Sequence, residues 1–198
     1  SGVVLSVFGV GYAFFRFVGE VAAVNILRLK GQTYFKRRFF EMTDSSAIIL
    51  IVVLGILLLF SAYFSATETA FTGFSQARMK NLAQKKKSAK LALKLSENYN
   101  RILSTLLIGN NIVNIAAASL ATLVFTFYFD DLGVTLSTIV MTVLVLIFGE
   151  ISPKSLAKER PEEFACFAAR PLQVFIILFF PLTFLFDLSL YTSDAADD

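Results

Sequence analysis

Residues 47–64 read AIILIVVLGILLLFSAYF, a run without a single charge. A helix that crosses the hydrocarbon core of a bilayer needs about 20 predominantly apolar residues. Two further uncharged stretches follow, at residues 102–129 and 134–148. The whole chain is 56% hydrophobic with a mean hydropathy of +0.70, which is too apolar for an ordinary soluble domain. The sequence therefore predicts an all-α integral membrane protein with three transmembrane helices.

A last apolar stretch at residues 164–190 is interrupted by proline. Pro181 lies near its centre and removes a helical hydrogen bond there. The stretch is either a kinked fourth span or a pair of short helices that enter and return on one side.

The two ends differ from the middle. Residues 1–41 place their basic residues after an apolar segment, the reverse of a signal peptide, and Met42 precedes a helix-capping Thr-Asp-Ser run. We interpret residues 1–41 as an extension foreign to the domain, the alternative being an additional membrane-associated helix. The membrane domain is expected at 42–191, and 192–198 form an acidic tail.

Composition restricts the chemistry. The chain has no histidine and one cysteine, Cys166, which argues against a disulfide framework, a zinc or copper site and imidazole catalysis. No nucleophile–base pair or phosphate-binding loop is found, so we expect no enzyme activity. A metal here must be bound by oxygen, which favours Mg²⁺, Ca²⁺ or an alkali ion.

The basic residues flank the apolar spans. Eight of them lie between Arg78 and Arg101, interleaved with Leu and Ala as in a helix on a membrane surface. Others follow at 154–160, within a second, mixed-charge loop expected at residues 154–163. This pattern indicates membrane topology, with both segments cytoplasmic, and not a nucleic-acid-binding face.

Polar residues inside spans are costly and call for partners. Ser61 and Ser65 are four residues apart and share a helix face, with Glu68 one turn further on. Asn110 and Asn114 share a face of the second span, with Asn111 adjacent. Alternatives to ion binding are hydroxyl bonds to the helix's own carbonyls and asparagine bonds between helices.

A third cluster ends the third span. Pro153 has no N–H and clashes with the residue four positions before it, which frees the carbonyl of Gly149, and Glu150 adds a carboxylate beside it. The alternative is a simple helix end with Glu150 among the lipid headgroups. Taken together, two hydroxyls, an amide oxygen, a carbonyl and one carboxylate approach the six oxygens that Mg²⁺ prefers.

Three motifs, FSATETAFTGFSQARMKNLAQ at 64–84, LLIGNNIVNIAAASLAT at 106–122 and FGEISPKSLAKERPE at 148–162, resemble the transmembrane (DUF21) domain of the CorC/CNNM magnesium transporters. The resemblance covers roughly residues 45–190. It implies a homodimer in the plasma membrane, with three spanning helices and a cytoplasmic-side pair of short helices. It also implies one Mg²⁺ held by Ser61, Ser65, Asn110, the Gly149 carbonyl and Glu150, with Asn111 as the alternative to Asn110.

For function, the resemblance implies export of Mg²⁺, or alternatively Co²⁺, driven by inward movement of Na⁺, with a Na⁺ site nearby. The competing hypotheses are a Mg²⁺-sensing regulator that does not itself transport, and a membrane anchor whose polar clusters only join helices. Full-length relatives carry cytosolic ATP-binding CBS domains and a CorC domain. Neither is found in these 198 residues, so we expect ATP to act only through such domains.

Overall fold

The computed structural model describes residues 44–183, and all of its regular structure is helical. The chain divides into two compact units, Ser1–Thr43 and Asp44–Asp198, and the described residues belong to the second. The expected extension at 1–41 and the acidic tail at 192–198 lie outside the described residues.

Two helical segments, Ser45–Gly73 and Tyr99–Glu159, are long and apolar enough to cross a membrane. Only 17% and 22% of their most apolar windows are buried within the protein, so they are not the core helices of a soluble fold. The elements of this unit are α3 (Asp44–Gly73), α4 (Gln76–Ala83), α5 (Lys87–Ser96), α6 (Tyr99–Phe129), η2 (Asp130–Leu132), α7 (Gly133–Leu144), η3 (Val145–Ile151), α8 (Ser152–Glu159) and α9 (Pro161–Leu178).

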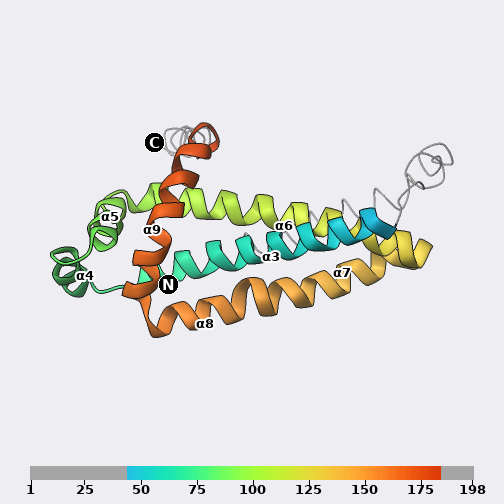
Figure 1. The fold of residues 1–198 in the computed structure, drawn as a ribbon, viewed down its shortest axis with the longest axis horizontal. Coiled ribbons are helices and arrows are strands. Elements are labelled where there is room, and N and C mark those ends of the chain that lie inside the picture. The colour runs from blue at the N-terminus through green and yellow to red at the C-terminus, as the bar shows by residue number, and fades with distance from the viewer. Residues whose placement is uncertain (1–43, 184–198) are drawn as a thin grey trace, which may run out of the picture. The chain divides into compact units, whose positions relative to one another are not determined.

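The second segment folds back on itself at η2, and α7 returns alongside α6 (Figure 1). Asp130 adopts a left-handed backbone with φ of 48° at this reversal, as short polar residues can at a turn. At Gly133 any side chain would collide with the α6 backbone at Thr126. The two arms then contact each other directly, with the Thr122 and Ser137 hydroxyl oxygens 3.2 Å apart.

The returning arm does not stop at Pro153. Residues 145–151 form a π-helical turn, and α8 continues the helix to Glu159. The loop expected at residues 154–163 is therefore wrong, because residues 154–159 belong to α8 and residues from 161 onward belong to α9. Proline lacks an N–H and is tolerated in the first turn of a helix, which is where Pro153 lies in α8.

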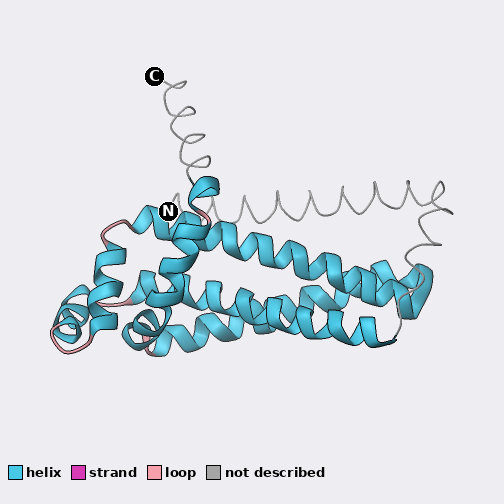
Figure 2. Ribbon diagram, turned by 45° about the horizontal axis from the view of Figure 1, so that its top comes forward, coloured by secondary structure: helices cyan, strands magenta, loops and turns pink. Residues whose placement is uncertain are grey.

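Helix α9 runs across the ends of the other helices instead of beside them (Figures 1 and 2). It is held against α3 by the Tyr63 hydroxyl, which donates to the Ala168 carbonyl at 2.9 Å. α9 ends at Leu178, and after a turn at Phe179 residues 180–183 are helical again. The described part of the expected proline-broken pair is therefore α9 and the first turn of a second helix. Residues 184–190, which would complete the pair, lie outside the described residues.

A hydrophobic core forms where α4, α5 and α9 meet α3 and α6. Its largest fully buried side chains are those of Phe64, Met79, Ile102, Leu106 and Leu172. The other end of the long helices has a smaller cluster around Ala117, Ala121 and Met141. The larger core fixes the parts of α3 and α6 that carry the predicted ion ligands.

Candidate cation site

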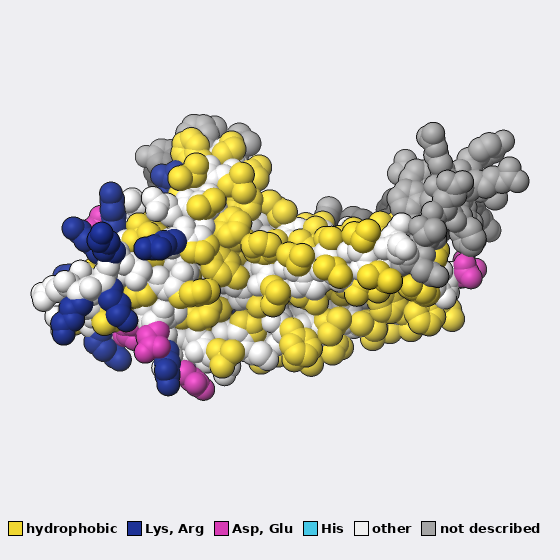
Figure 3. All heavy atoms as spheres, in the orientation of Figure 1, with side chains coloured by type: hydrophobic (Ala, Val, Ile, Leu, Met, Phe, Trp, Pro, Cys, Tyr) yellow, Lys and Arg dark blue, Asp and Glu magenta, His cyan; other side chains and the backbone are white. Residues whose placement is uncertain are grey.

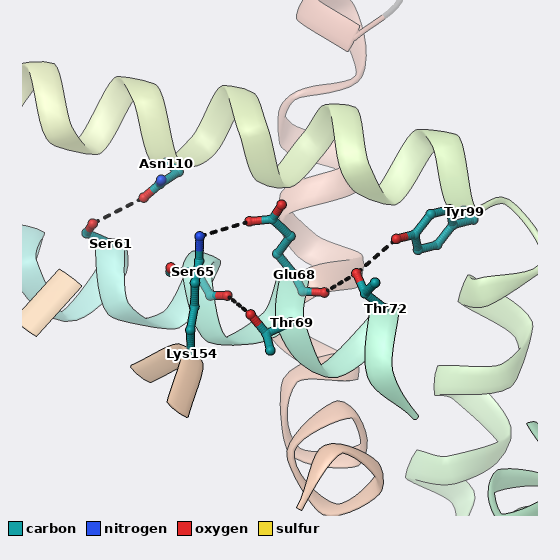
Figure 4. Close-up of polar contacts among 8 residues, drawn as sticks. All are labelled: Ser61, Ser65, Glu68, Thr69, Thr72, Tyr99, Asn110 and Lys154. Carbon is teal, nitrogen blue, oxygen red and sulfur yellow. Dashed lines mark hydrogen bonds and ion pairs between the residues drawn. The ribbon is translucent and has the colours of Figure 1, made fainter. Parts of the chain in front are cut away.

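Ser61 lies at the meeting point of three chain segments. Its side chain is fully buried, and its hydroxyl donates to Oδ1 of Asn110 at 3.1 Å, joining α3 to α6 (Figure 4). The same hydroxyl oxygen faces Gly149 of η3, where a Cβ atom would come within 2.8 Å of it. The sequence prediction that Ser61, Asn110 and Gly149 lie together is thus matched by direct contact.

Two glycines make this approach possible. Gly109, just before Asn110, lies so close to α3 that a Cβ there would be 2.7 Å from Cζ of Phe64. Gly149, just before Glu150, lies equally close to Ser61. Asn110 on α6 and Glu150 on η3 therefore each follow a glycine whose missing side chain lets its helix pack against α3.

Ser65, one turn further along α3, is 1% exposed and its hydroxyl has no hydrogen-bond partner among the described residues. Other hydroxyls on this helix behave differently. Thr67 and Thr69 donate to the carbonyls of Tyr63 and Ser65, at 2.6 and 3.1 Å. Because leaving a buried hydroxyl unpaired costs about 1–3 kcal/mol, Ser65 has an oxygen available for a ligand that is not protein.

The π-helical turn changes which carbonyl Pro153 leaves unpaired. The Ser152 N–H bonds to the Ile147 carbonyl, five residues back, instead of to Phe148 four residues back. In this register the partner of the Phe148 carbonyl would be the N–H of residue 153, which proline lacks. The missing N–H of Pro153 therefore leaves the Phe148 carbonyl without its donor, where the α-helical register predicted the Gly149 carbonyl. π turns of this kind are frequent at functional sites.

Glu150 supplies the carboxylate of this turn. Its side chain is half-buried, and no hydrogen bond or ion pair among residues 44–183 involves it. A carboxylate in a largely apolar segment without a protein partner is costly, which favours a cation as its partner.

The remaining predicted residues lie at different distances from this centre. Asn114, one turn beyond Asn110, has a buried Oδ1 without a partner among the described residues. Asn111 is half-buried and takes part in no hydrogen bond of the described residues. Glu68 is exposed and lies 3.9 Å from Nζ of Lys154, so its carboxylate is directed to α8 (Figure 4).

The oxygen donors in this set are of the kind that hard cations bind. Among the described residues no three His, Cys, Asp or Glu side chains cluster, so the donors are hydroxyl, amide and carbonyl oxygens with one carboxylate. Two oxygens bound side by side to an octahedral Mg²⁺ at 2.0–2.1 Å are about 2.9 Å apart. The 3.1 Å between the Ser61 and Asn110 oxygens is close to that spacing.

Two parts of the site escape sequence reasoning. The sequence pattern puts Lys154 in a loop, whereas its ion pair with Glu68 depends on the helical continuation into α8. The Phe148 carbonyl becomes available only through the π register, for which a proline alone gives no signal. The signals in the sequence that point to this turn are Pro153 and, four residues before it, Gly149.

Comparison with known proteins gives a consistent result. Residues 50–192 match a family profile described as "Cyclin M transmembrane N-terminal domain", CNNM. A UPF0053 protein of Haemophilus influenzae is 36% identical over 140 residues, covering 70% of this chain and 33% of the relative. A UPF0053 inner membrane protein of Escherichia coli is 42% identical over 129 residues, covering 63% of this chain and 29% of the relative.

A plant relative shows the same pattern. A DUF21 domain-containing protein of Arabidopsis thaliana, described as chloroplastic, is 34% identical over 158 residues, covering 80% of this chain and 24% of its own length. The chain thus spans about a quarter to a third of the length of these three relatives.

Proposed function

Because this chain belongs to the CNNM (DUF21) family of membrane domains, we propose that it moves Mg²⁺ across the membrane through the site around Ser61. The observation that carries the proposal is the convergence at Ser61 of Asn110 and the Gly149 turn, beside a buried Ser65 hydroxyl without a partner among the described residues. Oxygen donors with one carboxylate suit a hard divalent cation that must also be released.

The proposed path through the membrane has three crossings, by α3, by α6 and by α7 with η3. α7 and η3 contain 12 and 7 residues, which at a helical rise near 1.5 Å gives roughly 28 Å. That length is close to the hydrocarbon thickness of about 30 Å. The basic segment of α4–α5 and the charged end of α8 then lie on one side, which the positive-inside rule makes cytoplasmic.

The finer elements of the proposal come from the family resemblance. They are export from the cell across the plasma membrane, coupling to inward Na⁺ movement, Co²⁺ as an alternative cargo, and a homodimer as the working unit. ATP would act only through cytosolic regulatory domains of a longer chain.

Thermal unfolding of the purified chain tests the site. Mg²⁺ at 100 times its dissociation constant should stabilise the fold by about 2.7 kcal/mol. Glu150→Ala and Asn110→Ala should abolish this increment. Thr122→Val, which removes a hydroxyl elsewhere on α6, should keep it. Unchanged Mg²⁺ stabilisation in both site variants would contradict the assignment.

Flux in proteoliposomes separates a transporter from a Mg²⁺-sensing regulator. With a Na⁺ gradient imposed, the wild-type chain should move Mg²⁺ and Glu150→Ala should not. Mg²⁺-dependent stabilisation without flux would mean that the chain is a Mg²⁺-sensing regulator. If both stabilisation and flux were absent, the chain would be a membrane anchor.

A further inference from the structure

The hairpin of α4 and α5 carries a dense positive charge that the ion site does not use. Residues 76–101 contain eight basic side chains and one acidic side chain, Glu97, a net charge of +7. All eight basic side chains are exposed. Figure 3 shows them gathered over α4 and α5 at one end of the apolar surface.

Almost none of this charge is neutralised within the described residues. Of these eight side chains, only Arg78 has a carboxylate partner within residues 44–183, namely Glu162 at 3.3 Å. Arg101 lies over the ring of Phe180, with its guanidinium carbon 5.0 Å from the ring centroid. The lysines of α4, α5 and their connecting turn have no ion-pair partner between residues 44 and 183.

The lysines of α5 form one face. Lys87, Lys90 and Lys94 are spaced three and four residues apart, which places them together on the exposed side of the helix. The opposite side buries Ala89 and Ala92 in the core shared with α9. The direction of the charged face is therefore set by packing.

Helix α9, against which α5 packs, has an apolar outer face. Phe167, Val174 and Ile177 are 69%, 63% and 68% exposed, and their spacing places them on one side of the helix. Arg170 is exposed on the same side. Since α9 runs across the ends of the spanning helices (Figures 1 and 2), this face follows the plane of a membrane that those helices cross.

We propose that the α5 lysine face and the apolar face of α9 together bind anionic phospholipids in the leaflet that borders the α4–α5 hairpin. The lysines bind the headgroups, and the α9 face contacts the acyl chains. Clusters of four to eight basic residues directly beside a spanning helix attract anionic lipids by about 1 kcal/mol per charge. α6 becomes uncharged immediately after Arg101, so the hairpin directly precedes a candidate span.

A bilayer suits both faces, whereas a soluble acidic partner suits only one. Such a partner would neutralise the lysines of α5 but would leave Phe167 and Val174 of α9 in water. Lipid acyl chains cover the α9 face, while headgroup phosphates reach the lysines, whose flexible stems can extend along the interface.

Electron spin resonance of spin-labelled lipids tests this with the whole chain in phosphatidylcholine bilayers. The fraction of motionally restricted label gives the association constant of phosphatidylglycerol relative to phosphatidylcholine. This ratio should exceed one for the wild-type chain and should fall about fivefold or more when Lys87, Lys90 and Lys94 are all changed to Gln. The charge-preserving triple change to Arg should retain it, and added NaCl should weaken it.

Several outcomes would overturn the proposal. One is a Gln variant that keeps the wild-type ratio, and another is an Arg variant that loses it. If the association constants of the two lipids were equal for the wild-type chain, the lysine face would instead bind a soluble acidic partner. If inorganic phosphate lowered the relative association constant of phosphatidylglycerol more than chloride does at equal ionic strength, the lysine face would be a site for free phosphate. The inference is independent of ion transport, because both triple variants should keep the Mg²⁺-dependent thermal stabilisation.

Discussion

Two polar contacts between helix α6 and its neighbours differ in how completely the hydrogen bonds of their side chains are made. Near its start, Asn110 meets Ser61 of α3; we call Ser61, Ser65, Asn110 and Gly149 the Ser61 seam. Near its end, Thr122 meets Ser137 of α7, the Ser137 seam.

Both hydroxyl groups of the Ser137 seam have hydrogen-bond partners. Thr122 donates to the Ala118 carbonyl and Ser137 to the Val134 carbonyl, both at 2.9 Å, and the two hydroxyls also lie 3.2 Å apart. Ser137 is as deeply buried as Ser65, each being 1% exposed. Burial alone therefore does not distinguish the two seams.

At the Ser61 seam and at Asn114 beside it, polar atoms have no partners among residues 44–183. The Ser65 hydroxyl and the Asn114 amide oxygen, one turn from Asn110, are both buried and unpaired there. Joining helices requires only bonds of the kind seen at Ser137, whereas an ion site requires oxygens not already used. The difference favours helix joining for one seam and ion binding for the other.

The strongest test of this difference is Gly149→Ala. The new methyl group would come within 2.8 Å of the Ser61 hydroxyl and force it away from Asn110. We expect a loss of about 10- to 100-fold in Mg²⁺ affinity, as when a ligand's supporting contact is removed. Overpacking should also cost about 1–3 kcal/mol of stability. Isothermal titration and thermal unfolding would measure the two effects.

Gly55→Ala on α3 is the matched control. No atom lies within 4 Å of the position its Cβ would take, so the change should be neutral or stabilise the helix by up to about 1 kcal/mol. Mg²⁺ affinity should not change. Equal affinity losses in the two alanine variants would mean that the approach of Gly149 to Ser61 has no role in binding.

A pair of serine variants tests the same difference with a smaller effect. Ser137→Ala removes a satisfied hydroxyl and should destabilise the fold by about 1 kcal/mol with no change in Mg²⁺ affinity. Ser65→Ala removes an unpaired one, so without Mg²⁺ it should be neutral or stabilising, while affinity falls. If Ser65→Ala destabilises the ion-free protein and leaves affinity unchanged, Ser65 is part of the helix packing only.

The sequence is sufficient to predict the polar meeting of α3, α6 and η3. Ser61, Asn110 and Gly149 stand out because polar groups and helix breaks are rare within apolar spans. The sequence does not predict the hydrogen-bond register of η3. The rule that Pro153 frees the carbonyl four residues back assumes an α-helix, and a π turn shifts every bond by one residue. A proline also does not reveal whether it ends one helix or begins the next, so the helical continuation into α8 is equally hidden.

The smallest expected effect concerns Lys154, which borders the Ser61 seam without belonging to it. Its ammonium lies 3.9 Å from the Glu68 carboxylate, and Lys154 follows Pro153 directly, so it places a positive charge beside the proposed cation site. Lys154→Gln should raise Mg²⁺ affinity by up to about fivefold, the range of a partly exposed charge interaction, and less at high salt. Lys158→Gln, one turn along α8 and exposed, should change affinity less. Isothermal titration of both variants with Mg²⁺ at low and high NaCl would measure these changes in affinity. Equal gains would reflect surface charge alone, whereas a loss at Lys154 would mean that its pairing with Glu68 holds the π turn in place.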